Sequence, residues 1–300
     1  MKKVLLTTTA LVMTAGVAAA EVSMSGKTQV SISADGNAEN TLNTHIDFNV
    51  AVSGASDNGI TMSTGFGYDT GKEVDAGDFS VDATADNGWG TAAPNMTIGY
   101  AGYTFTVDGA GVADLYNGDT NTGELGISGS MGDVSFAATT NVQGDSASSY
   151  KVGYAMGDLS LTLTGSTDSD DTTANVDATK LALSYAMGDT TITASSDDSD
   201  DTAEAITKIG VSTKMDAITL SYSAASTGAA GSSVGDDWDA SISYSAGALT
   251  ASFAVDEDDV TKLSASYDLG GGANLFAVMK SGAANDGSED FQAIGLNFAF

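Results

Sequence analysis

The chain has 300 residues, a formal net charge of −30, one proline and no cysteine. A surface this acidic argues against nucleic acid or an anionic membrane as a partner, because both are bound through basic patches. Without cysteine no disulfide stabilises the fold, so packing and strand pairing must do so.

The first twenty residues have the features of a cleaved signal peptide. Two lysines form a positive n-region, a mostly apolar run covers residues 4–17, and three alanines at 18–20 supply a small-residue cleavage site. The apolar run is too short for a transmembrane helix, and no later stretch approaches the required length. We therefore expect an exported protein in which residues 1–20 are removed and residues 21–300 form a single domain. Any insertion of that domain into a membrane must use strands.

Beyond residue 20, apolar and polar side chains alternate along one segment after another. In the first segment, Val22, Val30 and Ile32 share one face, and Lys27 and Gln29 share the other. The same period of two recurs in the segments 42–53, 60–68, 96–107, 159–163, 181–185, 218–222 and 249–255. Segments of about ten residues with one apolar face are typical of transmembrane barrels. A soluble β-sandwich alternates in the same way, so the connections must decide between the two.

The connections fall into two kinds that alternate along the chain. The short ones carry Gly or Asp, which tolerate the positive φ of hairpin turns, at 131–133, 156–158, 187–189, 215–217, 246–248 and 269–271. The longer ones are polar and acidic, at 141–149, 166–177, 196–203, 225–237, 256–259 and 281–290. Outer-membrane barrels have short periplasmic turns and long extracellular loops. We therefore predict an all-β, transmembrane antiparallel β-barrel of 16–18 strands, about eighteen by count, enclosing an aqueous lumen.

Tyrosines mark the short-turn end of the predicted barrel. Four of them stand three residues before the glycine of a tight turn, and a fifth lies at nearly the same level. On the apolar face, half-polar rings at one height form an interfacial girdle. The predicted girdle consists of Tyr100, Tyr154, Tyr185, Tyr244 and Tyr267.

Lysines recur on the polar face, which a barrel turns toward its lumen. The spacing of several of them from the next tight turn places them roughly 20 Å above the short-turn end. They form either a basic arc on the pore wall or a set that only neutralises an acidic interior and avoids lipid. The predicted pore-lining lysines are Lys27, Lys151, Lys180, Lys208 and Lys262.

Acidic clusters lie at or beside the long loops, for example Asp236, Asp237 and Asp239. Their carboxylates suit Ca²⁺ or Mg²⁺, but none has the full EF-hand spacing, so a solvated acidic mouth is the favoured interpretation and no cofactor is expected. His45, the one histidine, shares the polar face with Asp47. No phosphate loop, Cys/His metal set or paired-carboxylate site is present, so we expect no enzymatic activity.

The last ten residues form a strand that ends in an aromatic residue. Ile294, Leu296, Phe298 and Phe300 share one face, opposite small or polar side chains. This stretch resembles the C-terminal strand of Gram-negative outer-membrane barrels, in which the terminal Phe serves as an assembly signal. The resemblance assigns that role to Phe300.

The whole chain beyond residue 20 resembles a general diffusion porin of the alphaproteobacterial type, most specifically at 21–26, 266–272 and Phe300. The resemblance implies a homotrimer in the outer membrane, surrounded by lipid and inserted by the barrel assembly machinery. It also implies a third loop folded into the lumen, with acidic loop residues facing basic wall residues. The first two long loops are 35–41 and 69–93, and the third is 109–122, which assigns Asp114, Tyr116 and Asp119 to the constriction. Two features depart from the family: this chain has no arginine, and the family barrel has sixteen strands.

These observations predict a channel for passive diffusion of ions and small hydrophilic solutes, with a preference for cations. One alternative is an acidic surface adhesin or a cation-binding β-protein that does not span a membrane, and another is a mainly structural barrel with a plugged lumen. The sorting of turns and loops favours the channel.

Overall fold

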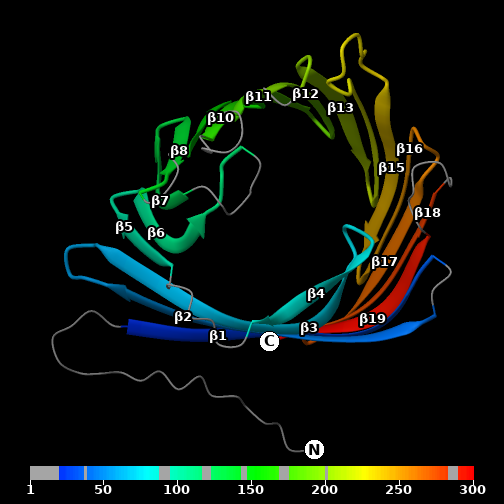
Figure 1. Ribbon diagram of the computed structural model, residues 1–300, viewed down its shortest axis with the longest axis horizontal. Coiled ribbons are helices and arrows are strands. Elements are labelled where there is room, and N and C mark those ends of the chain that lie inside the picture. Colours follow the sequence, from blue (N-terminus) through cyan, green and yellow to red (C-terminus); the bar gives the residue numbers. More distant parts are fainter. Residues whose placement is uncertain are drawn as a thin grey trace, which may run out of the picture.

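The computed structural model describes residues 20–36, 39–87, 95–116, 123–142, 147–168, 176–199, 202–282 and 290–300. Apart from Ala20, the expected signal peptide lies outside them, as does Asp119. The described residues form nineteen strands in one antiparallel sheet (Figure 1). These are β1 (Ala20–Asp35), β2 (Thr41–Ala55), β3 (Thr61–Asp75), β4 (Ser80–Asn87), β5 (Met96–Tyr100), β6 (Tyr103–Val112), β7 (Gly123–Met131), β8 (Val134–Thr140), β9 (Ser148–Met156), β10 (Leu159–Asp168), β11 (Val176–Met187), β12 (Thr190–Ser199), β13 (Ile206–Met215), β14 (Ile218–Ala225), β15 (Asp237–Ala246), β16 (Leu249–Asp256), β17 (Thr261–Gly270), β18 (Ala273–Ser281) and β19 (Phe291–Ala299).

The sheet closes on itself, because β1 pairs with β2 along one edge and with β19 along the other. The seam between first and last strands continues past β19, where the backbone groups of Gly26 and Phe300 exchange two hydrogen bonds of 3.1 and 3.0 Å. Among the described strands, only β4 stands outside the ring, since it pairs with β3 alone while β3 also pairs directly with β5. The prediction of an antiparallel barrel is confirmed, as is the count of eighteen strands in its wall.

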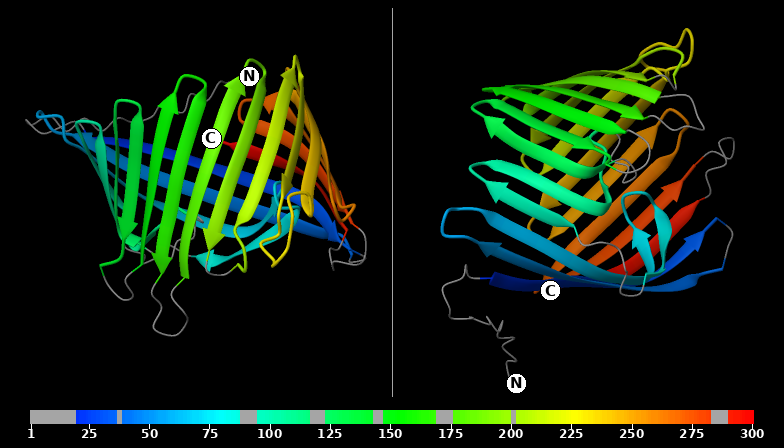
Figure 2. Two further views of the ribbon diagram at one scale, coloured as in Figure 1. Left: turned by 90° about the horizontal axis from the view of Figure 1, so that it is seen from above. Right: turned by 60° about the vertical axis from the view of Figure 1, so that its left-hand side comes forward.

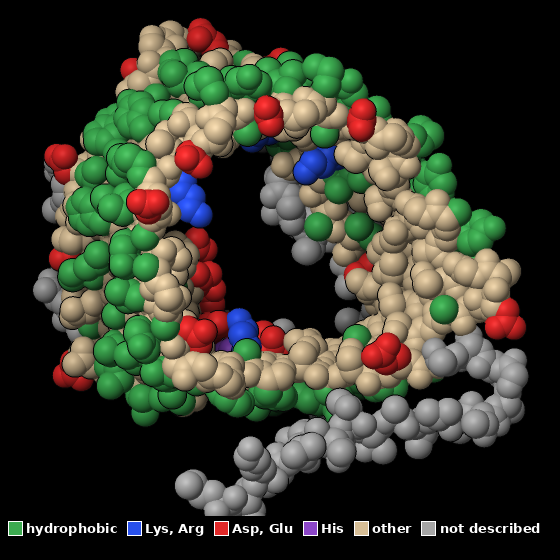
Figure 3. Space-filling model, turned by 180° about the vertical axis from the view of Figure 1, so that it is seen from behind, with side chains coloured by type: hydrophobic (Ala, Val, Ile, Leu, Met, Phe, Trp, Pro, Cys, Tyr) green, Lys and Arg blue, Asp and Glu red, His purple; other side chains and the backbone are tan. Residues whose placement is uncertain are grey.

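The two faces of the wall reverse the arrangement of a soluble protein. Along β1, Val30 and Ile32 are 53% and 49% exposed, whereas Gln29 and Ser31 on the opposite face are 3% and 2% exposed. Figure 3 shows hydrophobic side chains around the outside of the ring and a hollow lined by polar and charged groups within it. An apolar exterior around a polar interior suits a lipid surrounding.

The short connections have the backbone geometry that the sequence predicts. Gly132, Gly157, Gly188 and Gly247 have φ between 57° and 61°, and Asp216 has φ of 53°. Tight hairpins therefore gather at one end, the short-turn end, while the longer connections lie at the other, the long-loop end; the strands run obliquely between them (Figure 2). In the part of the chain that the structure describes, no helix has the length and apolar character needed to cross a membrane.

One stretch expected to be a loop is instead part of the sheet. The sequence assigns 69–93 to the second long loop, but β3 continues to Asp75 and β4 folds back against it. The two strands form a hairpin, here called the β3–β4 hairpin, that projects into the ring of strands (Figure 1). Its residues Val74, Phe79 and Val81 pack against β18 and β19 in a small apolar cluster completed by Phe276, Val278, Phe291 and Ala293.

The apolar cluster also resolves an ambiguity in β18. Phe276, Val278 and Lys280 lie on the same face of β18. From sequence alone, that face can be assigned neither to lipid, because of the lysine, nor to the lumen, because of the two apolar side chains. In the structure Phe276 and Val278 are buried, whereas Leu275 and Met279 on the opposite face are exposed. Phe276 and Val278 therefore face inward, where the β3–β4 hairpin covers them.

Candidate functional site: the lining of the barrel

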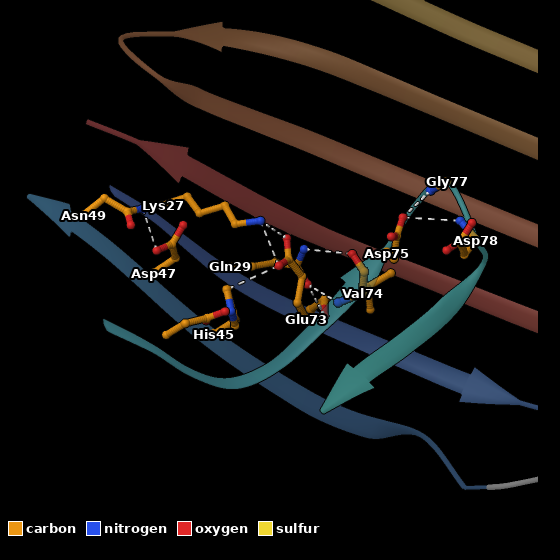
Figure 4. Close-up of polar contacts among 12 residues, drawn as sticks. Lys27, Gln29, His45, Asp47, Asn49, Glu73, Val74, Asp75, Gly77 and Asp78 are labelled. Carbon is orange, nitrogen blue, oxygen red and sulfur yellow. Dashed lines mark hydrogen bonds and ion pairs between the residues drawn. The ribbon is translucent and has the colours of Figure 1, made fainter. Parts of the chain in front are cut away.

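The β3–β4 hairpin is attached to the wall by a cluster of charged side chains (Figure 4). Lys27 on β1 donates to both carboxylate oxygens of Glu73 on β3, at 2.7 and 2.8 Å. Glu73 also lies 3.5 Å from Nδ1 of His45, and Nε2 of His45 contacts Asp69. The His45 side chain is only 1% exposed, so two carboxylates approach a buried ring from its two nitrogens. This charged cluster joins three neighbouring strands at the point where β3 turns inward.

A second attachment uses the backbone of the hairpin. Gln29, on the inner face of β1, donates from its amide to the carbonyl oxygen of Val74 at 3.1 Å and accepts from the Val74 N–H at 2.7 Å. A side-chain amide can satisfy one backbone donor and one acceptor, as a neighbouring strand would. Gln29 therefore covers part of the open edge of β3, where unpaired backbone groups would be costly to bury.

The start of the β6–β7 loop is fixed to a different part of the wall. Leu115 N–H donates to the hydroxyl of Ser149 on β9 at 2.9 Å, and the Tyr116 hydroxyl donates to Asp197 on β12. Asp114 is 5% exposed, and its carboxylate accepts the N–H of Tyr116 at 2.6 Å. The described part of the predicted constriction loop thus lies inside the barrel, against β9 and β12. Its role in the constriction remains a prediction.

The predicted pore-lining lysines all lie on inward-facing positions, but their surroundings differ. Lys180 forms a 3.1 Å ion pair with Asp197, directly opposite it on β12. Lys262 lies 4.0 Å from Asp256, on the adjacent strand β16. Lys151 and Lys208 are exposed and form no ion pair with a described residue.

Strand register brings two of these lysines together. Lys151 on β9 and Lys180 on β11 both pair with Thr164, on the strand between them. They therefore stand in one row across the wall, and this row continues to Asp197. The acidic neighbour of Lys180 thus comes from the wall itself, beside the Tyr116 hydroxyl of the loop.

Sequence reasoning missed the residues that hold the β3–β4 hairpin. Gln29, Asp69 and Glu73 carried no motif, and 69–93 read as a solvated loop. The one available signal was the inward parity of Phe276 and Val278, because apolar residues on the lumen side require a covering element.

The residues predicted for the membrane interface and for assembly lie at the short-turn end. The five tyrosines of the predicted girdle are all exposed, with relative accessibilities between 40% and 57%. Phe300 stacks near Phe298, with ring centroids 6.3 Å apart, and its backbone pairs with Gly26. Their roles as girdle and as assembly signal remain predictions.

Metal binding has no visible basis in the described part of the chain, where no group of three or more His, Cys, Asp or Glu side chains is arranged to hold an ion. Several residues of the acidic clusters, among them Asp170, Asp171, Asp200 and Asp201, lie outside the described residues. The clusters at 236–239 and 256–259 flank the long-loop ends of β15 and β16. Two of their carboxylates accept backbone N–H groups of nearby residues: Asp256 from Val260 at 2.9 Å and Asp236 from Ser233 at 2.7 Å.

Comparisons with known proteins agree with this architecture. The chain matches the Gram-negative porin family over residues 7–287, and no match was found among curated proteins. Similar solved structures include three variants of the Rhodopseudomonas blastica porin: one with five substitutions (TM-score 0.58), one with two introduced tryptophans (0.58) and a triple mutant (0.56). Each is 17% identical in sequence, over 93% of this chain and 100% of the other, so the likeness concerns the fold alone. The chain belongs to the Gram-negative porin family, as a transmembrane β-barrel of the outer membrane.

Proposed function

We propose that this protein is a water-filled channel through which ions and small hydrophilic solutes diffuse passively, and that it prefers cations. The observation that carries the proposal is the open hollow inside the ring, lined by polar and charged side chains and surrounded by an apolar exterior (Figure 3). A wall of about eighteen strands is wide enough to leave an aqueous lumen, whereas eight strands would be filled by side chains.

The charge balance supports a preference for cations. The chain has 40 acidic and 10 basic residues, and acids are frequent at the long-loop end. Two of the lumen lysines, Lys27 and Lys180, are also engaged by carboxylates at contact distance, which offsets their charge. Carboxylates at a pore mouth attract cations and repel anions over about a Debye length, ~8 Å at physiological salt.

The reversal potential of the purified protein in a planar bilayer under a KCl gradient tests this preference. We expect a shift toward the potassium equilibrium potential at low salt, and a smaller shift as salt rises and screens the carboxylates. A reversal potential of zero, or one shifted toward chloride, at low salt would contradict the cation preference.

Family membership supports the remaining parts of the proposal. We infer a homotrimer that contacts outer-membrane lipid and is inserted by the barrel assembly machinery, with Phe300 as part of the assembly signal. We also infer export by a signal peptide removed after residue 20. Chemical cross-linking of the detergent-purified protein would give a trimer ladder, and a product limited to the monomer would contradict the trimer.

A further inference from the structure

We propose that the β3–β4 hairpin is a fixed constriction of the channel, which limits the size of permeating solutes and places carboxylates in their path. This inference rests on the proposed function, since a size limit has meaning only in a conducting pore. It concerns residues 69–82, which precede and are separate from the β6–β7 loop that the family resemblance assigns to the constriction.

The position of the hairpin across the lumen is the first support. The hairpin lies against β1, β18 and β19, through Gln29 and the apolar cluster with Phe276 and Phe291. The start of the β6–β7 loop lies against β9 and β12, through Ser149 and Asp197. These two groups of strands are on opposite sides of the ring (Figure 1). The passage therefore runs between the hairpin and the loop.

The way the hairpin leaves the wall is the second support. Up to Gly71, β3 pairs with β2, and beyond it β3 pairs only with β4, with a register shift between Asp69 and Gly71. Gly71 has φ of 105°, and a Cβ at this position would overlap the carbonyl oxygen of Thr44. A glycine at the bend lets the strand turn inward in close contact with β2.

Three kinds of contact hold the hairpin in place and make it a fixed element. Its tip buries Val74 at 2% exposure in the apolar cluster, its backbone edge is covered by Gln29, and Glu73 is bound by Lys27. Apolar burial, backbone hydrogen bonds and a bidentate charged contact each stabilise this position. Together they hold the hairpin against β1, β18 and β19.

Its charges are the third support. Residues 69–82 carry five acids, Asp69, Glu73, Asp75, Asp78 and Asp82, and one lysine, Lys72. Asp69 and Glu73 are engaged by His45 and Lys27, whereas Asp78 and Asp82 are exposed. Exposed carboxylates on an element inside the lumen favour cations over anions at the narrow part of the passage.

A shortened hairpin tests the size limit. Glu73 and Asp82 are paired across the hairpin, so replacing residues 74–81 with Asn-Gly joins them through a two-residue turn and keeps the Glu73 contacts. Phe276→Thr and Val278→Thr in the same variant keep the uncovered wall polar. We expect a higher single-channel conductance and entry of larger polyethylene glycols than in the intact protein. The matched control removes the same number of residues from the β14–β15 loop, within 227–236. It should leave the single-channel conductance and the size limit for polyethylene glycol unchanged.

The position and the charge of the hairpin can be tested separately. Because the chain has no cysteine, a single introduced thiol can be labelled selectively. Asp78→Cys and, as a control at the short-turn end, Asp57→Cys each provide a single thiol for a bulky maleimide-polyethylene glycol, with labelling checked by gel shift. Labelling at position 78 should reduce the current, and labelling at 57 should not. Asp78→Asn with Asp82→Asn should move the reversal potential toward zero, by more than Asp57→Asn does.

The outcomes separate the two proposals. If the intact protein forms no conducting channels, the proposed function fails. If the intact protein conducts, but the shortened hairpin and the labelled Asp78→Cys variant conduct as it does, the hairpin is not in the solute path and this inference is overturned. Because the cysteine variant retains the full hairpin, a folding failure of the shortened variant leaves the question decidable.

Discussion

Gln29 illustrates how a single inward side chain can hold an element inside a barrel. Its amide satisfies both the N–H and the carbonyl of Val74, and both residues are buried. A leucine of similar size would leave two buried backbone groups without partners, at a cost of about 1–3 kcal/mol for each. The inner face of β1 therefore carries a side chain that matches the backbone groups of the hairpin, which polarity alone would not provide.

We expect Gln29→Leu to lower the midpoint of chemical unfolding of the detergent-folded barrel and to make the hairpin more susceptible to added protease. Gln292→Leu is the matched control, because Gln292 is an exposed glutamine on the neighbouring strand β19. Equal midpoints and equal cleavage rates for the two variants would show that Gln29 does not hold the hairpin.

Gly26 has a comparable role at the seam of the barrel. A Cβ at this position would lie 2.5 Å from the carbonyl oxygen of Asp47 and 2.7 Å from Cζ of Phe300. Gly26→Ala should therefore displace the Phe300 ring and weaken the pairing of β1 with β19. We expect the folded band on unheated gels to be lost at a lower temperature than in the parent protein.

The control for the seam is Gly54→Ala on β2, where the nearest atom to a Cβ is 4.0 Å away. Gly54→Ala should behave as the parent does. If both alanine variants lose the folded band at the parent temperature, close packing between Gly26 and Phe300 contributes nothing to closure.

Among the elements, the β3–β4 hairpin depends on the bend at Gly71. Gly71→Ala places a side chain at a positive φ and against Thr44, whereas Gly59→Ala has a similar φ, 85°, with no atom within 4 Å. Both variants carry the cost of a left-handed backbone, of order 1–3 kcal/mol. The overlap with Thr44 should make Gly71→Ala the more destabilising of the two by chemical unfolding. Equal unfolding midpoints would mean that β2 does not constrain the bend.

The elements of the wall could be predicted from sequence, because alternation in β1 and β19 and the turn glycines are local signals. The hairpin could not, because Val74, Phe79 and Val81 are spread through an acidic segment that reads as a solvated loop. Its binding surface, Phe276 and Phe291, lies some 200 residues away in the chain and carries no sign of its partner.

For the lining of the barrel, the positions of the lumen lysines could be predicted from sequence, but their carboxylate partners could not. The inward position of Lys27 and Lys180 follows from the parity of their strands, so sequence alone identifies it. The partners Glu73 and Asp197 depend on strand register and on the inward bend of β3, and neither is a local property. Register is set by pairing across the sheet, and a shift of one residue would reverse every side chain.

At the scale of the whole molecule, the barrel combines an apolar exterior with a polar lumen, and two elements lie against opposite inner walls of that lumen. Because the chain has no cysteine, stability comes from strand pairing around the ring and, among the described residues, from the apolar cluster under the hairpin. The acid excess, 40 residues against 10 basic ones, is the basis of the proposed preference for cations.

The central claim, that this lumen is a continuous aqueous passage, is tested most directly by single-channel recording of the purified protein in a neutral-lipid bilayer. We expect discrete current steps whose conductance rises in proportion to the bulk conductivity of KCl at high salt, as it does when ions cross in water. A protein that inserts and shows the folded band on gels, yet gives no current steps or a conductance independent of salt, would contradict the account.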